Sequence, residues 1–140
     1  MKKRIGSVLL ALALCLSLLP ATALAEGAET VSTLNFCSDP PTVETTYNIR
    51  GGGTATWTPG SNGVQNKLNK LTLDNVVMTD TNNILKVPAN TEIILTGTNE
   101  ITATSGTAIW AQGGPLKISG TGSLEVTALS NKALWSNQSS

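Results

Sequence analysis

The clearest pattern along the chain is a short apolar–polar–apolar unit that recurs with a period of about 23 residues, in the range typical of solenoid repeats. Three copies lie at residues 71–73, 93–95 and 116–118, so their starts are almost evenly spaced. Each is followed two positions later by a turn former, namely Asn75, Gly97 or Gly120. No stretch between them shows a helical period of 3.6, and we therefore predict short β-strands.

Two more sets of strand-like positions follow each unit. The first is the apolar column Val77, Ile101 and Leu124, continued by Thr79, Ala103 and Val126. The second consists of residues 84–86, 108–110 and 133–135, which recur at nearly the same period. The repeating unit thus holds three short strands bounded by Gly, Asn or Ser.

This repetition predicts an all-β fold for residues 43–140. A strand of three to five residues cannot bury its face alone, but equivalent strands of successive repeats can stack into a continuous core, as in a parallel β-helix of three to four rungs. A weaker fourth rung is expected upstream, where Tyr47, Ile49 and Gly51 precede Leu71, Leu73 and Asn75 by one such period. The alternative is an antiparallel β-sandwich, but the single Asn-Gly turn, at residues 62–63, lies outside the repeats.

The N-terminal part has a different character. Residues 1–25 combine a basic start at residues 2–4, an apolar run at 8–19 and a small-residue site ending at Ala25, which predicts a cleaved signal peptide and export. Residues 26–42 are polar and contain Asp39-Pro40-Pro41, so we expect a leader or linker with a short strand near residues 34–37.

Charge and composition exclude several functions. The chain has nine basic and nine acidic residues, but three of the basic ones lie in the signal peptide, which leaves a mature net charge of −3. This balance argues against nucleic acid and against anionic membranes, and no membrane insertion is expected after cleavage. Histidine is absent, which excludes Ser-His-Asp catalysis and His-ligated metals. After cleavage Cys37 is the single cysteine, expected to be partly buried and without an internal disulfide.

The repeats at residues 71–75, 93–101 and 116–124 resemble exported right-handed β-helix proteins of Gram-positive anaerobes. They are similar to a family often called carbohydrate-binding-domain-containing, which is related in fold to pectate lyases. The resemblance covers residues 43–137 and implies secretion or a bacterial cell-surface location, binding of acidic plant polysaccharide, and calcium in some members. The matched residues are core and turn positions, so no catalytic or ligand residue is carried over.

Candidate catalytic and metal sites are few. The mature chain has one arginine, Arg50, and its repeat carboxylates Asp74, Asp80, Glu92, Glu100 and Glu125 are expected at non-equivalent points of the repeat. A calcium site on Asp74 and Asp80 is conceivable, although two exposed carboxylates near turns are more often simply solvated. No catalytic constellation is visible, so we do not expect an enzyme.

The third strand of each repeat carries the better candidate. If Leu85, Ile109 and Leu134 point inward, alternation places Lys86, Trp110 and Trp135 outward in one column. Two indoles beside a lysine could form a platform for a sugar ring, with the lysine attracting uronates. The competing interpretations are that these tryptophans pack under a loop or a neighbouring domain, or that they belong to the core.

The sequence therefore favours a non-catalytic exported surface module that binds polysaccharide. The alternatives are the N-terminal fragment of a β-helix polysaccharide lyase and a structural spacer of a larger surface protein. Nothing amphipathic follows the last repeat, so its edge is expected either to continue into a longer solenoid or to pair end to end with another copy.

Overall fold

The computed structural model describes residues 27–60 and 67–137, and the signal peptide predicted at residues 1–25 lies outside this part. The described chain consists of β-strands and turns without a helix, which confirms the all-β class. In order, the strands are β1 (Thr30–Val31), β2 (Leu34–Asn35), β3 (Thr45–Ile49), β4 (Thr54–Thr58), β5 (Asn69–Asp74), β6 (Val77–Asp80), β7 (Leu85–Pro88), β8 (Thr91–Thr96), β9 (Thr98–Ala103), β10 (Ile109–Gln112), β11 (Leu116–Gly120), β12 (Ser123–Ala128) and β13 (Leu134–Asn137).

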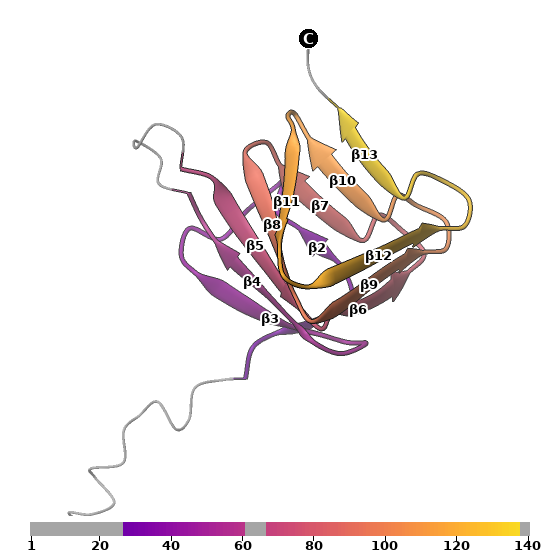
Figure 1. The fold of residues 1–140 in the computed structure, drawn as a ribbon, viewed down its shortest axis with the longest axis horizontal. Coiled ribbons are helices and arrows are strands. Elements are labelled where there is room, and N and C mark those ends of the chain that lie inside the picture. Colours follow the sequence, from indigo (N-terminus) through magenta and orange to yellow (C-terminus); the bar gives the residue numbers. More distant parts are fainter. Residues whose placement is uncertain (1–26, 61–66, 138–140) are drawn as a thin grey trace, which may run out of the picture.

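The strands form three sheets that surround one apolar core (Figure 1). Sheet A has the order β1-β3-β4-β5-β8-β11, sheet B the order β13-β10-β7-β2, and sheet C the order β12-β9-β6. From β5 onward the chain visits sheets A, C and B in turn, three times over. We call these passages round 1 (β5–β7), round 2 (β8–β10) and round 3 (β11–β13), and every pairing between successive rounds is parallel.

The register of sheet B is the one that the sequence predicts. Leu85 lies opposite Ile109, and Ile109 lies opposite Leu134. Leu85 and Ile109 are fully buried, because alternation along the strand turns this column into the core. The predicted column for the third strand of each repeat is confirmed.

The predicted column of sheet A is confirmed between β5 and β8, where Leu71 lies opposite Ile93, and is wrong at β11, whereas the predicted column of sheet C is wrong by one or two positions. Ile93 pairs with Ile118 and not with Leu116, because β11 is shifted by two positions relative to the register that the apolar units suggest. A slip of two positions keeps the same face inward, so the apolar pattern alone did not reveal it.

In sheet C, Ile101 pairs with Met78 and Val126, where the sequence suggested Val77 and Leu124. The consequence is clear at β6, where a shift of one position reverses the face. Met78 is 1% exposed, whereas Val77 is 37% exposed.

The expected fourth rung is also wrong. β3 does not stack directly on β5, because β4 lies between them and pairs antiparallel with both. Tyr47 therefore lies opposite Ala55, which in turn lies opposite Leu73. This N-terminal part closes one side of round 1 with a different kind of pairing.

Part of the segment expected to be a polar leader belongs to the folded body. β2 confirms the short strand predicted near residues 34–37 and pairs parallel with β7, with Leu34 opposite Leu85. The next buried side chain, Phe36, stacks on Trp57 with 4.3 Å between ring centroids, and Tyr47 meets Phe36 edge-on. Offset and edge-on pairs of this kind add about 0.5–1.5 kcal/mol beyond area burial.

Asn99 is the polar residue that ties the rounds together inside the core. Its side chain is fully buried, and its Oδ1 accepts a hydrogen bond of 3.0 Å from the backbone N–H of Val76 in round 1. Its Nδ2 donates to the carbonyl oxygens of Thr96 and of Ser123 in round 3. One amide thus satisfies backbone groups of three successive rounds, which buried polar groups require.

We predict that Asn99→Ala lowers the free energy of unfolding by about 2–3 kcal/mol, because it leaves buried backbone groups without partners. Urea unfolding followed by circular dichroism measures this change. Asn131→Ala is the matched control, since Asn131 is exposed and its side chain accepts a hydrogen bond from the neighbouring N–H of Lys132. Equal stability of the two variants would contradict the role assigned to Asn99.

Candidate functional site

The register of sheet B brings the three predicted binding residues into one outward column. Lys86 on β7 lies opposite Trp110 on β10, and Trp110 lies opposite Trp135 on β13. The two indoles are stacked, with 5.1 Å between ring centroids and 14° between ring planes. This separation follows from the inter-strand spacing of about 4.8 Å. Neither tryptophan is part of the buried core: Trp110 is half-buried and Trp135 is 36% exposed.

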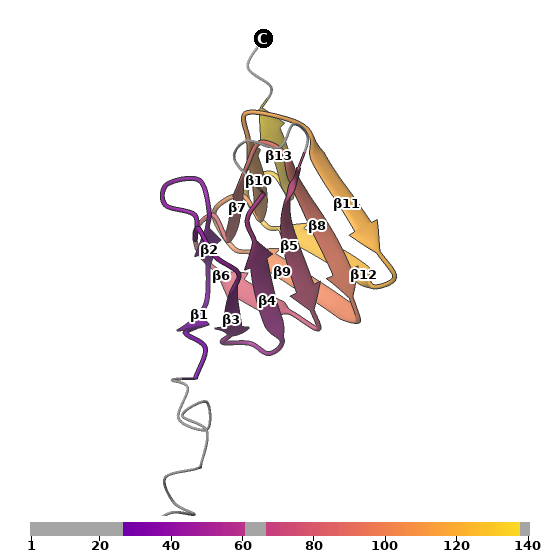
Figure 2. The ribbon, with the colours of Figure 1, turned by 90° about the vertical axis from the view of Figure 1, so that its left-hand side faces the viewer.

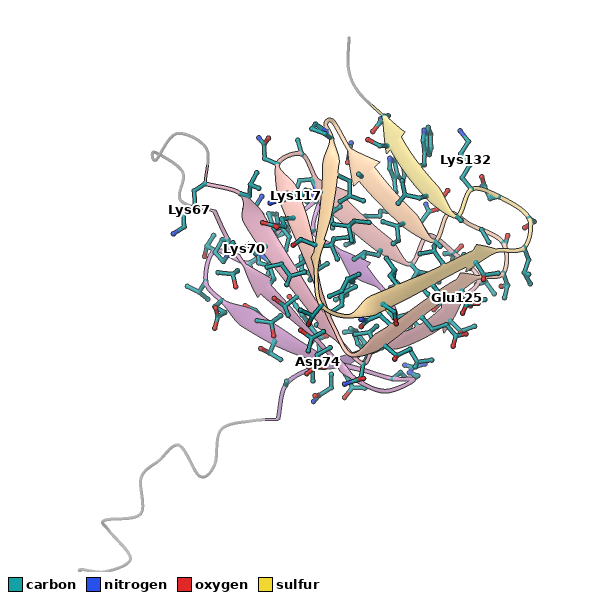
Figure 3. The ribbon with its side chains drawn as sticks, in the orientation of Figure 1. Lys67, Lys70, Asp74, Lys117, Glu125 and Lys132 are labelled. Atoms are coloured by element: carbon teal, nitrogen blue, oxygen red, sulfur yellow. The ribbon has the colours of Figure 1, made fainter. Side chains whose placement is uncertain are left out.

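Two lysines close the ends of this column. The Nζ of Lys86 lies 5.2 Å from the ring centroid of Trp110, and the Nζ of Lys132 lies 4.4 Å from that of Trp135. Figure 3 shows Lys132 on the turn that leads into β13. We call the set Lys86, Trp110, Trp135 and Lys132 the indole ladder. Lys132 is not apparent from the sequence pattern, because it stands in a turn, outside the alternating positions of the strand.

The ladder differs from a flat platform in one important respect. Stacked indoles cover each other's ring faces. One face of Trp110 is covered by Trp135 and the other by Lys86. The outer face of Trp135 is covered by a single exposed lysine side chain, Lys132. Such a cation–π contact at an exposed site contributes about 0.5–1 kcal/mol, so Lys132 can be displaced at small cost.

The ladder also holds an unsatisfied donor. The Nε1 of Trp110 is buried and has no hydrogen-bond partner among the described residues. A buried N–H without an acceptor costs about 1–3 kcal/mol. This atom is a group that a bound hydroxyl or carboxylate could satisfy if the neighbouring side chains moved.

The two carboxylates considered for calcium are both engaged by protein donors. Asp80 accepts hydrogen bonds from the N–H of Thr81 at 2.6 Å and from the Oγ of Ser32 at 3.0 Å, and these lower its pKa. Asp74 lies at the end of β5, in another sheet, and accepts a hydrogen bond from Asn75 (Figure 3). Asp80 therefore fastens the segment around Ser32 to β6, a structural task.

One expectation about the carboxylates is wrong. Glu100 and Glu125 do share a column, because the register of β9 and β12 places them directly opposite each other. Two adjacent like charges are unfavourable in a sheet unless something offsets them. Within residues 27–60 and 67–137, however, no group of three or more Asp, Glu, Cys or His side chains could hold a metal ion.

The outer face of sheet A carries a charged column that the sequence analysis did not identify. Lys70, Glu92 and Lys117 lie opposite one another on β5, β8 and β11 (Figure 3). The Nζ of Lys117 lies 2.9 Å from Glu92, and the Oγ of Ser119 donates to the same carboxylate at 2.7 Å. The Ser119 hydroxyl and the Lys117 ammonium lower the pKa of Glu92. The Lys117 side chain is 62% exposed, so solvent screens this ion pair and its contribution to stability is small.

Two other features bear on candidate chemistry. Arg50 lines a shallow hollow of about 200 Å³ beside β6, together with Ser32 and Asp80. Cys37 is half-buried, as predicted, and burial raises the pKa of its thiol. A raised pKa disfavours the reactive thiolate, so Cys37 is not suited to nucleophilic chemistry.

No family model, no curated protein and no solved structure matches this chain. Across the described ranges, no helix is long and apolar enough to cross a membrane. A function must therefore be inferred from the geometry of the indole ladder.

The lowered pKa of Asp80 predicts a pH-dependent contribution to stability. A carboxyl with a lower pKa in the folded state stabilises the fold above its unfolded pKa, and this contribution is lost as the pH falls through the folded value. We expect Asp80→Asn to lower the free energy of unfolding at pH 7 by about 0.5–1 kcal/mol, a small effect because solvent screens the group. The difference from wild type should vanish in acid.

Urea unfolding at a series of pH values from 7 downward measures this dependence. Ser32→Ala removes one donor to Asp80 and should have a smaller effect of the same sign. Asp39→Asn, in an exposed position, is the control. A difference between wild type and Asp80→Asn that does not change with pH would contradict the assignment.

Proposed function

We propose that this chain is a non-catalytic, exported module that binds polysaccharide at the indole ladder. The observation that carries the proposal is the column of two stacked indoles with a lysine at each end. Aromatic faces bind the C–H side of sugar rings, and ammonium groups attract uronate carboxylates. Export rests on the signal-peptide pattern of residues 1–25, and a location at the bacterial surface on the family resemblance.

The fold that we propose for this module is a right-handed parallel β-helix of three rounds. Its support is the threefold passage through the same sheets in the same order, with parallel pairing between all successive rounds. Right-handedness is the expected hand for parallel crossover connections. An antiparallel sandwich would pair neighbouring strands in the opposite sense, which here occurs only around β4 among the described strands.

The outer face of Trp135 is the place where a sugar ring would bind. Trp110 already covers the inner face, and Lys132 covers the outer face with one flexible side chain. A sugar ring that displaced Lys132 would continue the stack, and the freed ammonium would remain close enough to meet a carboxylate of the ligand. Trp110 supports Trp135 from below, and Lys86 adds a second positive charge to the column.

We predict that Trp135→Ala abolishes retention of the chain on polysaccharide, with at least a tenfold loss of affinity. Loss of a stacking aromatic typically costs more than about 1.4 kcal/mol, which is that factor of ten. Trp110→Ala should weaken binding as well, because it removes the support of Trp135. Affinity electrophoresis through neutral and uronate-containing polysaccharides measures retention, with circular dichroism as the test of folding.

Leu129→Ala is the matched control, since Leu129 is an exposed apolar residue outside the ladder. It should bind like the wild type. Lys132→Ala should leave neutral glycans bound and weaken uronates, and added salt should weaken only the uronates. Undiminished retention of a folded Trp135→Ala variant would refute the proposed site.

A further inference from the structure

Round 3 differs from the other two rounds in how well its inward side chains are covered. Ile118 is 40% exposed and Leu134 is 46% exposed, although their register partners Ile93 and Ile109 are fully buried. Leu116, Leu124 and Val126 are only partly buried for the same reason. These side chains form one apolar surface across the end of the core, which we call the end face. Isolated exposed apolar residues are ordinary, but a contiguous set marks an interaction site.

The end face is framed by three strand edges. β11, β12 and β13 each stand last in their sheets, and no described strand pairs with their outer edges. Figure 2 shows β11 and β12 at the end of the molecule opposite β1 and β3. Exposed edges present unpaired N–H and C=O groups that favour pairing with another chain. A partner that satisfies this surface must offer an apolar centre and three edges at once.

The opposite end of the molecule cannot serve as that partner. There, β4 pairs antiparallel with β5, and the outermost strands of sheets A and B are β1 and β2, with two residues each. Head-to-tail stacking would need an edge in each of the three sheets that matches the end face, and at this end only β6, with four residues, is of comparable length. An open filament is therefore disfavoured, because heterologous growth requires complementary opposite ends.

We propose that the end face binds the end face of a second copy, which gives a closed two-fold dimer. A two-fold axis perpendicular to the direction of stacking reverses the strands of one copy, so the facing edges run antiparallel and can exchange regular hydrogen bonds. The inward side chains of round 3 carry no charge, so the two end faces can pack against each other through apolar contacts. The rim bears both signs, with Lys117, Glu125 and Lys132 on or beside the three strands (Figure 3), so a lysine of one rim can face the glutamate of the other.

The dimer also has a consequence for the indole ladder, and this consequence alone rests on the proposed function. Trp135 lies on β13, so its outer face points toward the partner copy once the edge of β13 is paired. Glycan and partner then compete for one face, and each weakens the binding of the other by the same factor. Saturating oligosaccharide should shift the dimer toward monomer.

The test uses the chain from Glu26 onward, without sugar, in sedimentation-velocity and equilibrium runs from about 1 μM to 1 mM, a range that brackets moderate affinities. We expect a reversible monomer–dimer equilibrium that stops at twice the chain mass. Ile118→Lys, which lies in sheet A away from the indole ladder, should weaken dimerisation at least a hundredfold, and Leu134→Lys should do the same. Val43→Lys is the control, since Val43 is highly exposed outside the end face, and should dimerise like the wild type.

Hydrogen exchange on the unmodified chain is the second measurement and does not depend on a variant that folds. Amides of β11, β12 and β13 should become more protected as the protein concentration rises, while those of β5 and β8 stay unchanged. The proposal is overturned if the chain remains monomeric at all concentrations or assembles beyond a dimer. It is also overturned if the Ile118→Lys variant dimerises as strongly as the wild type. These results are independent of glycan retention, so dimerisation and the proposed function can fail separately.

Discussion

Parallel backbone pairing between successive rounds is the interaction on which the structure depends. The longest strands have six residues, and none of them could bury an apolar face alone. Stacking in register turns isolated apolar residues such as Leu85 and Ile109 into a column that excludes water. The same stacking brings the buried amide of Asn99 within reach of three rounds, so core packing and polar satisfaction arise from one geometry.

The register between successive rounds arranges the outer surface as well as the core. Residues at equivalent positions of successive rounds lie side by side, whatever their chemistry. Sheet B thereby acquires a stack of indoles, sheet A a column of alternating charge, and sheet C two adjacent glutamates. Because the two indoles stack on each other, most of their ring faces are covered. The accessible aromatic surface is therefore concentrated on Trp135 at the end of the column. The proposed glycan site is thus linked to the state of the last round.

The two ends of the stack differ in how well their side chains and strand edges are covered. β1 to β4 close the side of round 1, where Phe36 and Trp57 add an aromatic core of their own. Round 3 keeps its inward side chains partly exposed and its three edges unpaired among the described residues. Because any added round or partner would have to satisfy this end, it is the position where ligand binding and self-association are expected to influence each other.

The sequence by itself determined the all-β class, the three-strand repeat and the column of Lys86, Trp110 and Trp135, because alternation and recurrence are local properties of the chain. It misplaced Leu116 and Val77, since a periodic pattern tolerates small slips and spacing alone does not fix turn length. Only the tertiary structure decided the antiparallel insertion of β4, the bridging by Asn99 and the place of Lys132 on the ladder. Each of these features depends on contacts between different segments of the chain. A local sequence pattern does not show which segments pack against each other.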